Sequence, residues 1–126
     1  MKTLILLFAL FSCGVSCTKD AATANDRELP VIIFSSPTTG QVYAAGQAIT
    51  ISGTITDNDS IAEVHIHVTN INTGSLLMDV HLYPGASTAS FNQSITAVAG
   101  INYKILVTAK DRAVNEGRNS VEVSVP

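Results

Sequence analysis

The chain has 126 residues, with seven Lys and Arg against ten Asp and Glu, which gives a formal net charge of −3. This length suits one domain. Because phosphate binding needs a concentrated Lys/Arg surface, the mild acidity and the lack of a basic cluster exclude nucleic acid as a partner. Trp is absent, and only Tyr43 and Tyr83 are candidates for stacking on a sugar.

The N-terminal segment MKTLILLFALFSCGVSCTKD has the features of a secretory signal. Lys2 precedes an apolar run at residues 4–11, which is too short to cross a bilayer because a transmembrane helix needs roughly 20 apolar residues. Small residues and a cysteine follow, so the segment resembles a bacterial lipoprotein precursor. The resemblance implies a signal peptide over residues 1–16 and a palmitate-type lipid on Cys17, which anchors the exported chain to a membrane.

Two cysteines compete as the lipidation site. Cys13 follows Leu-Phe-Ser, the better match to a lipobox, whereas Cys17 gives a signal of more usual length. We favour Cys17 and keep Cys13 as the alternative. Cleavage before Cys17 leaves no other cysteine, so the domain has neither a disulfide nor a Cys-based metal site. Thr18 in the next position resembles the pattern of lipoproteins that are sent to the outer membrane of a Gram-negative cell envelope, where they face the periplasm or the surface. The inner membrane is the alternative location.

The rest of the chain divides into a tether and a domain. Residues 17–28 are polar and aperiodic, which predicts a flexible tether. Residues 29–126 show short alternating runs between turn residues, which predict antiparallel sheets with one buried face each. The expected strands are 31–34, 41–43, 48–56, 62–69, 76–83, 89–96, 101–110 and 120–125, with polar loops at 57–60 and 111–119. The expected core includes Ile51, Val64, Ile66, Ile105 and Val107.

Several segments carry a family likeness. Residues 36–40 (SPTTG), 46–57 (GQAITISGTITD) and 61–68 (IAEVHIHV) resemble the opening of bacterial immunoglobulin-like domains. Residues 103–115 (YKILVTAKDRAVN) are similar to the penultimate strand and final loop of cadherin-like and fibronectin-like modules. The resemblance implies an all-β, immunoglobulin-like antiparallel β-sandwich of about seven strands, and it implies almost nothing about activity. Tyr103, near the start of a strand, is a candidate tyrosine corner.

Oxygen ligands are expected at one end of the sandwich. Asp57 and Asp59 lie in one predicted loop and Asp111 and Asn115 in another, and a Greek-key sandwich brings these loops together. Such a set suits Ca²⁺, which takes about six to eight oxygen ligands. The alternative is that these residues only form turns and cap backbone N–H groups.

Histidines form a second candidate metal site. His65 and His67 are two residues apart on a predicted strand, so both side chains leave the same face. His81 is expected to point outward from the following strand. With the right register the three imidazoles converge and suit Zn²⁺ or Cu²⁺. The alternative is an exposed polar face that tolerates histidine.

Catalytic motifs are not found in the sequence. Asp79 is two residues from His81, but no nucleophile elbow, His-Glu-x-x-His motif or Walker loop occurs. The sequence therefore favours a lipid-anchored, non-catalytic cell-envelope module that needs no cofactor. Its expected role is binding or adhesion, with a protein or glycan ligand, or structural spacing. The alternatives are a metal-binding envelope protein, with Ca²⁺ or Zn²⁺ as the ion, and a small hydrolase.

Overall fold

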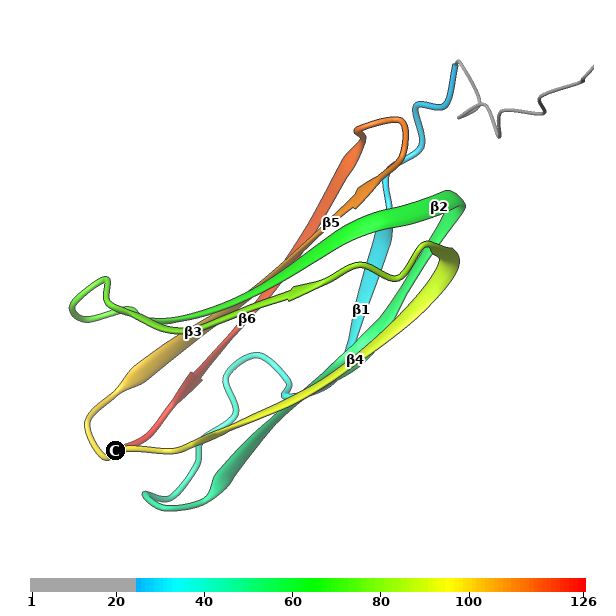
Figure 1. Ribbon diagram of the computed structural model, residues 1–126. Helices are drawn as coiled ribbons and strands as arrows, with labels where there is room; N and C mark the ends of the chain where they lie inside the picture. The colour runs from blue at the N-terminus through cyan, green and yellow to red at the C-terminus, as the bar shows by residue number, and fades with distance from the viewer. Residues whose placement is uncertain (1–24) are drawn as a thin grey trace, which may run out of the picture.

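The computed structural model describes residues 25–126, and every regular element in this range is a β-strand (Figure 1). The six strands are Val31–Ser36 (β1), Ala48–Asn70 (β2), Leu76–Leu82 (β3), Ala86–Thr96 (β4), Asn102–Asp111 (β5) and Glu116–Ser124 (β6). All pairs of neighbouring strands are antiparallel. The described residues contain no helix long and apolar enough to cross a membrane.

The long strand β2 belongs to both layers of the fold. Its first half pairs with β1 and β4, so that Ile55 lies opposite Ile32 and Ala89. Its second half pairs with β3 and β5, so that Ile66 lies opposite Val80 and Val107. Between the halves the strand turns sharply (Figure 1), and β6 completes the second sheet beside β5. The antiparallel, immunoglobulin-like sandwich expected from the sequence is confirmed.

Residues 57–60 were expected to form a loop, and this prediction is wrong. They belong to β2, which joins the expected strands 48–56 and 62–69 into one strand of 23 residues. Pairing with β4 shifts between Thr56 and Ile61, and pairing with β5 shifts between Ile61 and Glu63. Such irregularities bend a strand while its backbone stays extended. The polar residues at the bend therefore mark a corner between sheets, and the fold has six strands where about seven were expected.

The last strand begins earlier than expected. Residue 120 was its predicted first residue, whereas β6 begins at Glu116 and the loop before it is confined to residues 112–115. Residues 116–119 lack apolar alternation but still pair with β5, with Gly117 opposite Ala109. A Cβ at Gly117 would lie 1.9 Å from the carbonyl oxygen of Pro30. The predicted short strand 41–43 forms a single parallel bridge, between Val42 and Ser124.

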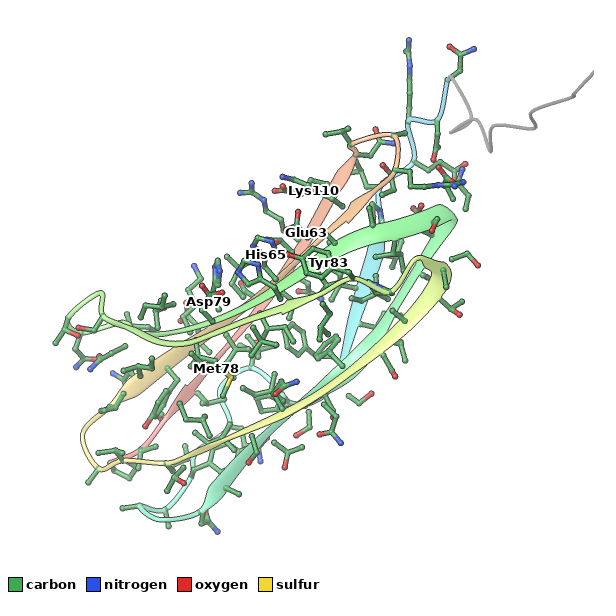
Figure 2. The ribbon with its side chains drawn as sticks, in the orientation of Figure 1. Glu63, His65, Met78, Asp79, Tyr83 and Lys110 are labelled. Carbon is green, nitrogen blue, oxygen red and sulfur yellow. The ribbon has the colours of Figure 1, made fainter. Side chains whose placement is uncertain are left out.

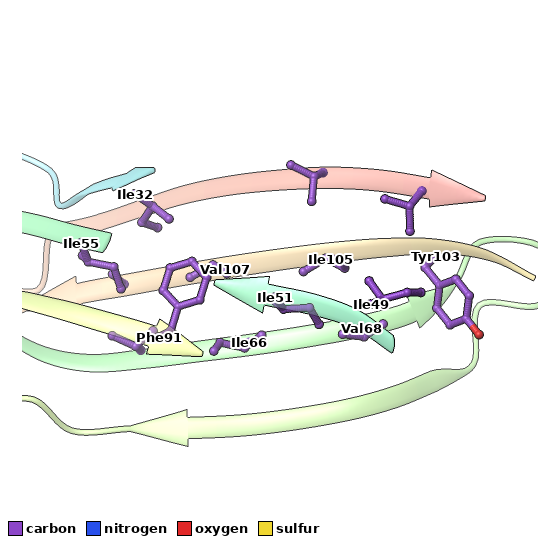
Figure 3. Close-up of a cluster of buried hydrophobic side chains, with 14 of the residues drawn as sticks. Ile32, Ile49, Ile51, Ile55, Ile66, Val68, Phe91, Tyr103, Ile105 and Val107 are labelled. Atoms are coloured by element: carbon purple, nitrogen blue, oxygen red, sulfur yellow. The ribbon is translucent and has the colours of Figure 1, made fainter. Parts of the chain in front are cut away.

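The core lies between the two sheets (Figure 3). All five residues that the alternation predicts to be core are fully buried: Ile51, Val64, Ile66, Ile105 and Val107. Burial of each such side chain contributes roughly 1.5–3 kcal/mol relative to leaving it exposed. The rings of Phe34 and Phe91 pack edge to face, with centroids 5.6 Å apart.

Tyr103 forms the predicted tyrosine corner. Its side chain is buried, and its hydroxyl oxygen accepts a hydrogen bond from the backbone N–H of Val98 at 2.9 Å. The same hydroxyl lies 3.5 Å from the carbonyl oxygen of Thr96. Through these contacts the buried ring of Tyr103 holds the segment between β4 and β5 against the core.

Candidate functional site

The register between β2 and β3 gathers polar side chains on the outer face of the second sheet. His65 lies directly opposite His81, and His67 lies opposite Asp79. Facing residues, and residues two apart on a strand, share one face of a sheet. Figure 2 shows His65 and Asp79 on this outer face, whereas Met78 points between the sheets.

The three predicted histidines lie close together. Each offers a ring nitrogen, and these atoms lie within 4.8 Å of one another. The imidazoles of His65 and His81 stack with centroids 3.9 Å apart. Asp79 Oδ1 lies 3.1 Å from Nε2 of His67 and 3.0 Å from Nε2 of His81. The structure thus adds a carboxylate to the predicted imidazoles, while metal binding itself stays a prediction.

Glu63 extends the histidine cluster along β2. Its Oε1 lies 2.6 Å from Nε2 of His65, and this hydrogen bond lowers the pKa of the Glu63 carboxyl. Lys110 lies opposite Glu63 on β5 and pairs with Glu116 at 3.4 Å. A hollow of about 40 Å³ between these residues and Thr108 has room for little more than water or an ion.

A second polar cluster lies at the bend of β2. Carboxylate oxygens of Asp26, Asp57 and Asp111 approach within 4.8 Å of one another. Oδ2 of Asp26 and Oδ1 of Asp57 are buried and have no hydrogen-bond partner among the described residues. Asp26 comes from the segment predicted to be a tether, and its Oδ1 accepts a hydrogen bond from Nδ2 of Asn58 at 3.0 Å.

The ionisation of Asp57 reflects this crowding. Burial raises the pKa of its carboxyl most, and the negative charges of Asp111, Asp26 and Asp59 raise it further. A hydrogen bond from the backbone N–H of Asp59 opposes this effect. Both carboxylate oxygens of Asp111 accept hydrogen bonds, whereas one oxygen of Asp57 accepts none from the part of the chain that the structure describes. The backbone N–H and Nδ2 of Asn115 donate to Asp111 at 2.8 and 2.7 Å.

The predicted oxygen-ligand set is brought together only in part. Asp59 is directed to Arg112, with 2.9 Å between Oδ1 and the guanidinium, and this hydrogen bond lowers the pKa of Asp59. Asp26 takes its place beside Asp57 and Asp111. The sequence holds no signal for Asp26, since it lies outside every periodic segment and reaches the cluster only through the tertiary fold. Ca²⁺ binding stays a prediction.

The opposite end of the sandwich carries an open groove. It has a volume of about 410 Å³ and is lined by Thr39, Gly40, Ile71, Asn102, Glu122, Val123 and Ser124. Tyr43, one of the two tyrosines considered for sugar stacking, is buried, whereas Tyr83 is 69% exposed. Cys13, Cys17, the signal peptide and most of the predicted tether lie outside the described residues, so lipidation stays a prediction.

Solved structures share this fold at low sequence identity. The fibronectin(III)-like modules of Clostridium thermocellum CbhA match 77% of this chain with a TM-score of 0.53 and 23% identity, and the match spans 46% of that chain. Superoxide reductase (neelaredoxin) from Ignicoccus hospitalis matches with a TM-score of 0.52 and 11% identity, over 79% of this chain and 81% of that chain. A CARDB domain from Pyrococcus furiosus, in complex with di-metal ions, matches with a TM-score of 0.51 and 14% identity, over 86% of this chain and 100% of that chain.

The sequence comparisons identify the family. No curated protein matches the chain. The family model described as the bacterial Ig domain matches residues 30–123, which is nearly all of the described sandwich. This match agrees with the two-sheet architecture and with the segments whose likeness the sequence carries. The chain belongs to the bacterial Ig domain family.

Proposed function

We propose that this bacterial Ig-like module works in the cell envelope, where a lipid on Cys17 anchors it and the sandwich holds a non-catalytic binding surface away from the membrane. The observation that carries the proposal is the position of the chain ends. The first described residues lie beside the β5–β6 loop, and the C-terminus lies at the opposite end of the sandwich (Figure 1). A lipid anchor on the N-terminal side would hold the end with the β5–β6 loop toward the membrane, so the end with the C-terminus would face away from it.

The outward end is built from loops that are tied to one another. The backbone N–H of Gly46 donates to Ala97, and that of Gly100 donates to Val125, both at 2.8 Å. Ile71 donates its N–H to the carbonyl oxygen of Asn102 at 2.8 Å. These bonds support a loop surface that is held in place, which lowers the conformational cost of binding.

The composition of this end favours a protein over a glycan as the partner. Three apolar side chains at this end are about half exposed or more: Val42, Ile71 and Val98. Ile71 lines the open groove, and Val42 forms a bridge to Ser124 of its lining. Apolar side chains of this kind suit a protein surface. Among the described aromatic residues only Tyr83 is largely exposed, so a stacking platform for sugars has little support.

The proposal is tested by crosslinking the lipidated protein in its parent envelope and identifying attached proteins by mass spectrometry. We expect Ile71→Asp and Val98→Asp to lose a partner that the wild-type protein retains. Val114→Asp is the matched control, because Val114 is 73% exposed in the β5–β6 loop at the other end and already has a positive φ of 71° that Asp tolerates. Equal loss in the control, or retention in both test variants, would contradict the outward-end surface.

A further inference from the structure

We propose that His65, His67, His81 and Asp79 form a binding site for a divalent transition-metal ion of the Zn²⁺ or Cu²⁺ class. The site lies on the outer face of the β2–β3 pair and goes beyond the proposed anchoring and binding role. Three imidazole nitrogens and one carboxylate oxygen are a donor set that Zn²⁺ and Cu²⁺ accept in proteins.

Strand register places the four side chains at the corners of one rectangle. His65 faces His81 and His67 faces Asp79 across the β2–β3 ladder. Facing residues have Cβ atoms about 4.5–5.5 Å apart, which is short enough for side chains of this length to meet above the sheet. A shift of one residue would send two of the side chains to the buried face, so the register is essential to the site.

The donor atoms already approach the spacing of a coordination shell. Zinc–nitrogen bonds of about 2.0–2.1 Å place neighbouring tetrahedral ligands about 3.3 Å apart. Asp79 Oδ1 lies 3.1 Å from Nε2 of His67 and 3.0 Å from Nε2 of His81. One ring nitrogen of each histidine lies within 4.8 Å of the other two, so the donors need only small movements to close the shell. The Nε2 protons of His67 and His81 shift to Nδ1 or leave when these atoms bind the ion.

Glu63 positions the third imidazole. A carboxylate only accepts hydrogen bonds, so at 2.6 Å from Glu63 Oε1 the Nε2 of His65 acts as the donor. Nδ1 of His65 then keeps its lone pair for an ion. Histidines that bind metals commonly donate their other N–H to a carboxylate in this way, which fixes the tautomer and raises the basicity of the ligand.

The charges around the cluster favour a cation. Asp79 and Glu63 bring two negative charges, and neutral Thr108 and Leu106 lie opposite His65 and His67 on β5. Lys110, which lies opposite Glu63 on β5, is paired with Glu116. A divalent ion would balance the two carboxylates without displacing an existing cation.

The scaffold is rigid beneath the site and open above it. The residues that alternate with the β2 histidines, Val64, Ile66 and Val68, are fully buried in the core, so the backbone that carries the ligands is fixed. The side chains of the four ligands are between 28% and 43% exposed. An ion can therefore reach preorganised ligands directly from solvent.

The test is calorimetric titration of the purified, untagged protein with ZnCl₂ and CuCl₂ in a non-chelating buffer. We expect one ion per chain and a loss of Zn²⁺ affinity of at least about tenfold in each of His67→Gln, His81→Gln and Asp79→Asn, because loss of even an outer-shell partner costs about that much. Asp57→Asn is the matched control for Asp79→Asn and should bind Zn²⁺ like the wild type. Equal Zn²⁺ affinity in the wild type and the three ligand variants would overturn the site.

A second measurement covers variants that fail to fold. The chain contains three histidines, and all of them belong to the cluster, so their side-chain NMR signals in the wild-type protein come from the site alone. Zn²⁺ should shift these signals, and Cu²⁺ should give an electron paramagnetic resonance spectrum with nitrogen hyperfine coupling. Unchanged histidine signals at saturating Zn²⁺ would refute the proposal without any variant.

Discussion

Replacement of Asp57 by Asn should stabilise the protein at neutral pH. The carboxyl of Asp57 is crowded by Asp26 and Asp111, and one of its oxygens is buried without a hydrogen-bond partner among the described residues. Two unit charges about 4 Å apart repel by about 1 kcal/mol in water and by about 4 kcal/mol at the dielectric of a protein surface. Since Asp57 is half-buried, we expect Asp57→Asn to raise the free energy of unfolding by about 1–2 kcal/mol. For a domain of this size, each kcal/mol corresponds to about 4–8 °C in melting temperature.

The pH dependence of this effect has a defined sign. Burial and neighbouring charges raise the pKa of Asp57 in the folded state, so the folded protein binds this proton more tightly than the unfolded chain does. Ionised Asp57 therefore opposes folding at neutral pH, and stability is regained as the pH falls through the folded-state pKa. The advantage of Asp57→Asn should be largest near neutral pH and should shrink as the wild-type carboxyl becomes protonated.

Asp59 provides the matched control two residues away. Its hydrogen bond to Arg112 lowers its pKa, so the ionised form stabilises the fold above the unfolded-state pKa and this contribution is lost as the pH falls through the folded-state pKa. Asp59→Asn should therefore lower the melting temperature at neutral pH. Thermal melts in EDTA measure both variants, and a lowered melting temperature for Asp57→Asn would refute the reasoning.

Melts repeated with Ca²⁺ in place of EDTA test the calcium-binding alternative that the sequence left open. Ca²⁺ bound by the acidic cluster would relieve the repulsion that Asp57→Asn removes, and a ligand at a hundredfold excess over its Kd adds about 2.7 kcal/mol of stability. Ca²⁺ binding would raise the melting temperature of the wild type and not that of the variant, whereas residues that only form turns, which the sequence favours, predict no shift. No shift in the wild type would show that the cluster holds no Ca²⁺.

Three further predictions concern the fold and the anchor. Tyr103→Phe should cost about 1 kcal/mol in chemical denaturation because a buried hydrogen bond is lost, whereas exposed Tyr83→Phe should be neutral; equal effects would dismiss the tyrosine corner. Gly117→Ala should lower the melting temperature, since its Cβ would lie 1.9 Å from a backbone oxygen, and an unchanged melt would mean that the neighbouring segment moves aside. Cys17→Ala should abolish partitioning into the detergent phase while Cys13→Ala leaves it intact, and the reverse result would move the lipid to Cys13.

Alternation predicted the core of the fold because it depends only on local spacing. Residues such as Ile51, Ile66 and Val107 follow a period of two, and a sheet with one buried face requires that period. Residues 57–60 and 116–119 were assigned to loops because they are polar. Residues 57–60 instead form the extended bend between the two paired halves of β2, and residues 116–119 pair with β5. Pairing across strands holds a polar segment extended, and a single sequence carries no direct signal for it.

The candidate sites show the same division between local and tertiary information. Spacing within β2 places His65 and His67 on one face, but only the β2–β3 register brings His81 and Asp79 over them. The residues of the acidic cluster are farther apart in the sequence, and only the tertiary fold brings Asp26 beside Asp57 and Asp111.

Strand β2 links the two clusters physically. Its bend carries Asp57, and its second half carries His65 and His67 on a backbone fixed by buried residues. Because the strand is continuous, a shift in its pairing would disturb both clusters, whereas a change confined to the acidic side chains would leave the histidine register intact. If Asp57→Asn retains Zn²⁺ binding, the two clusters are independent sites on one strand. If the variant loses Zn²⁺ binding, the histidine site depends on the pairing of the whole strand.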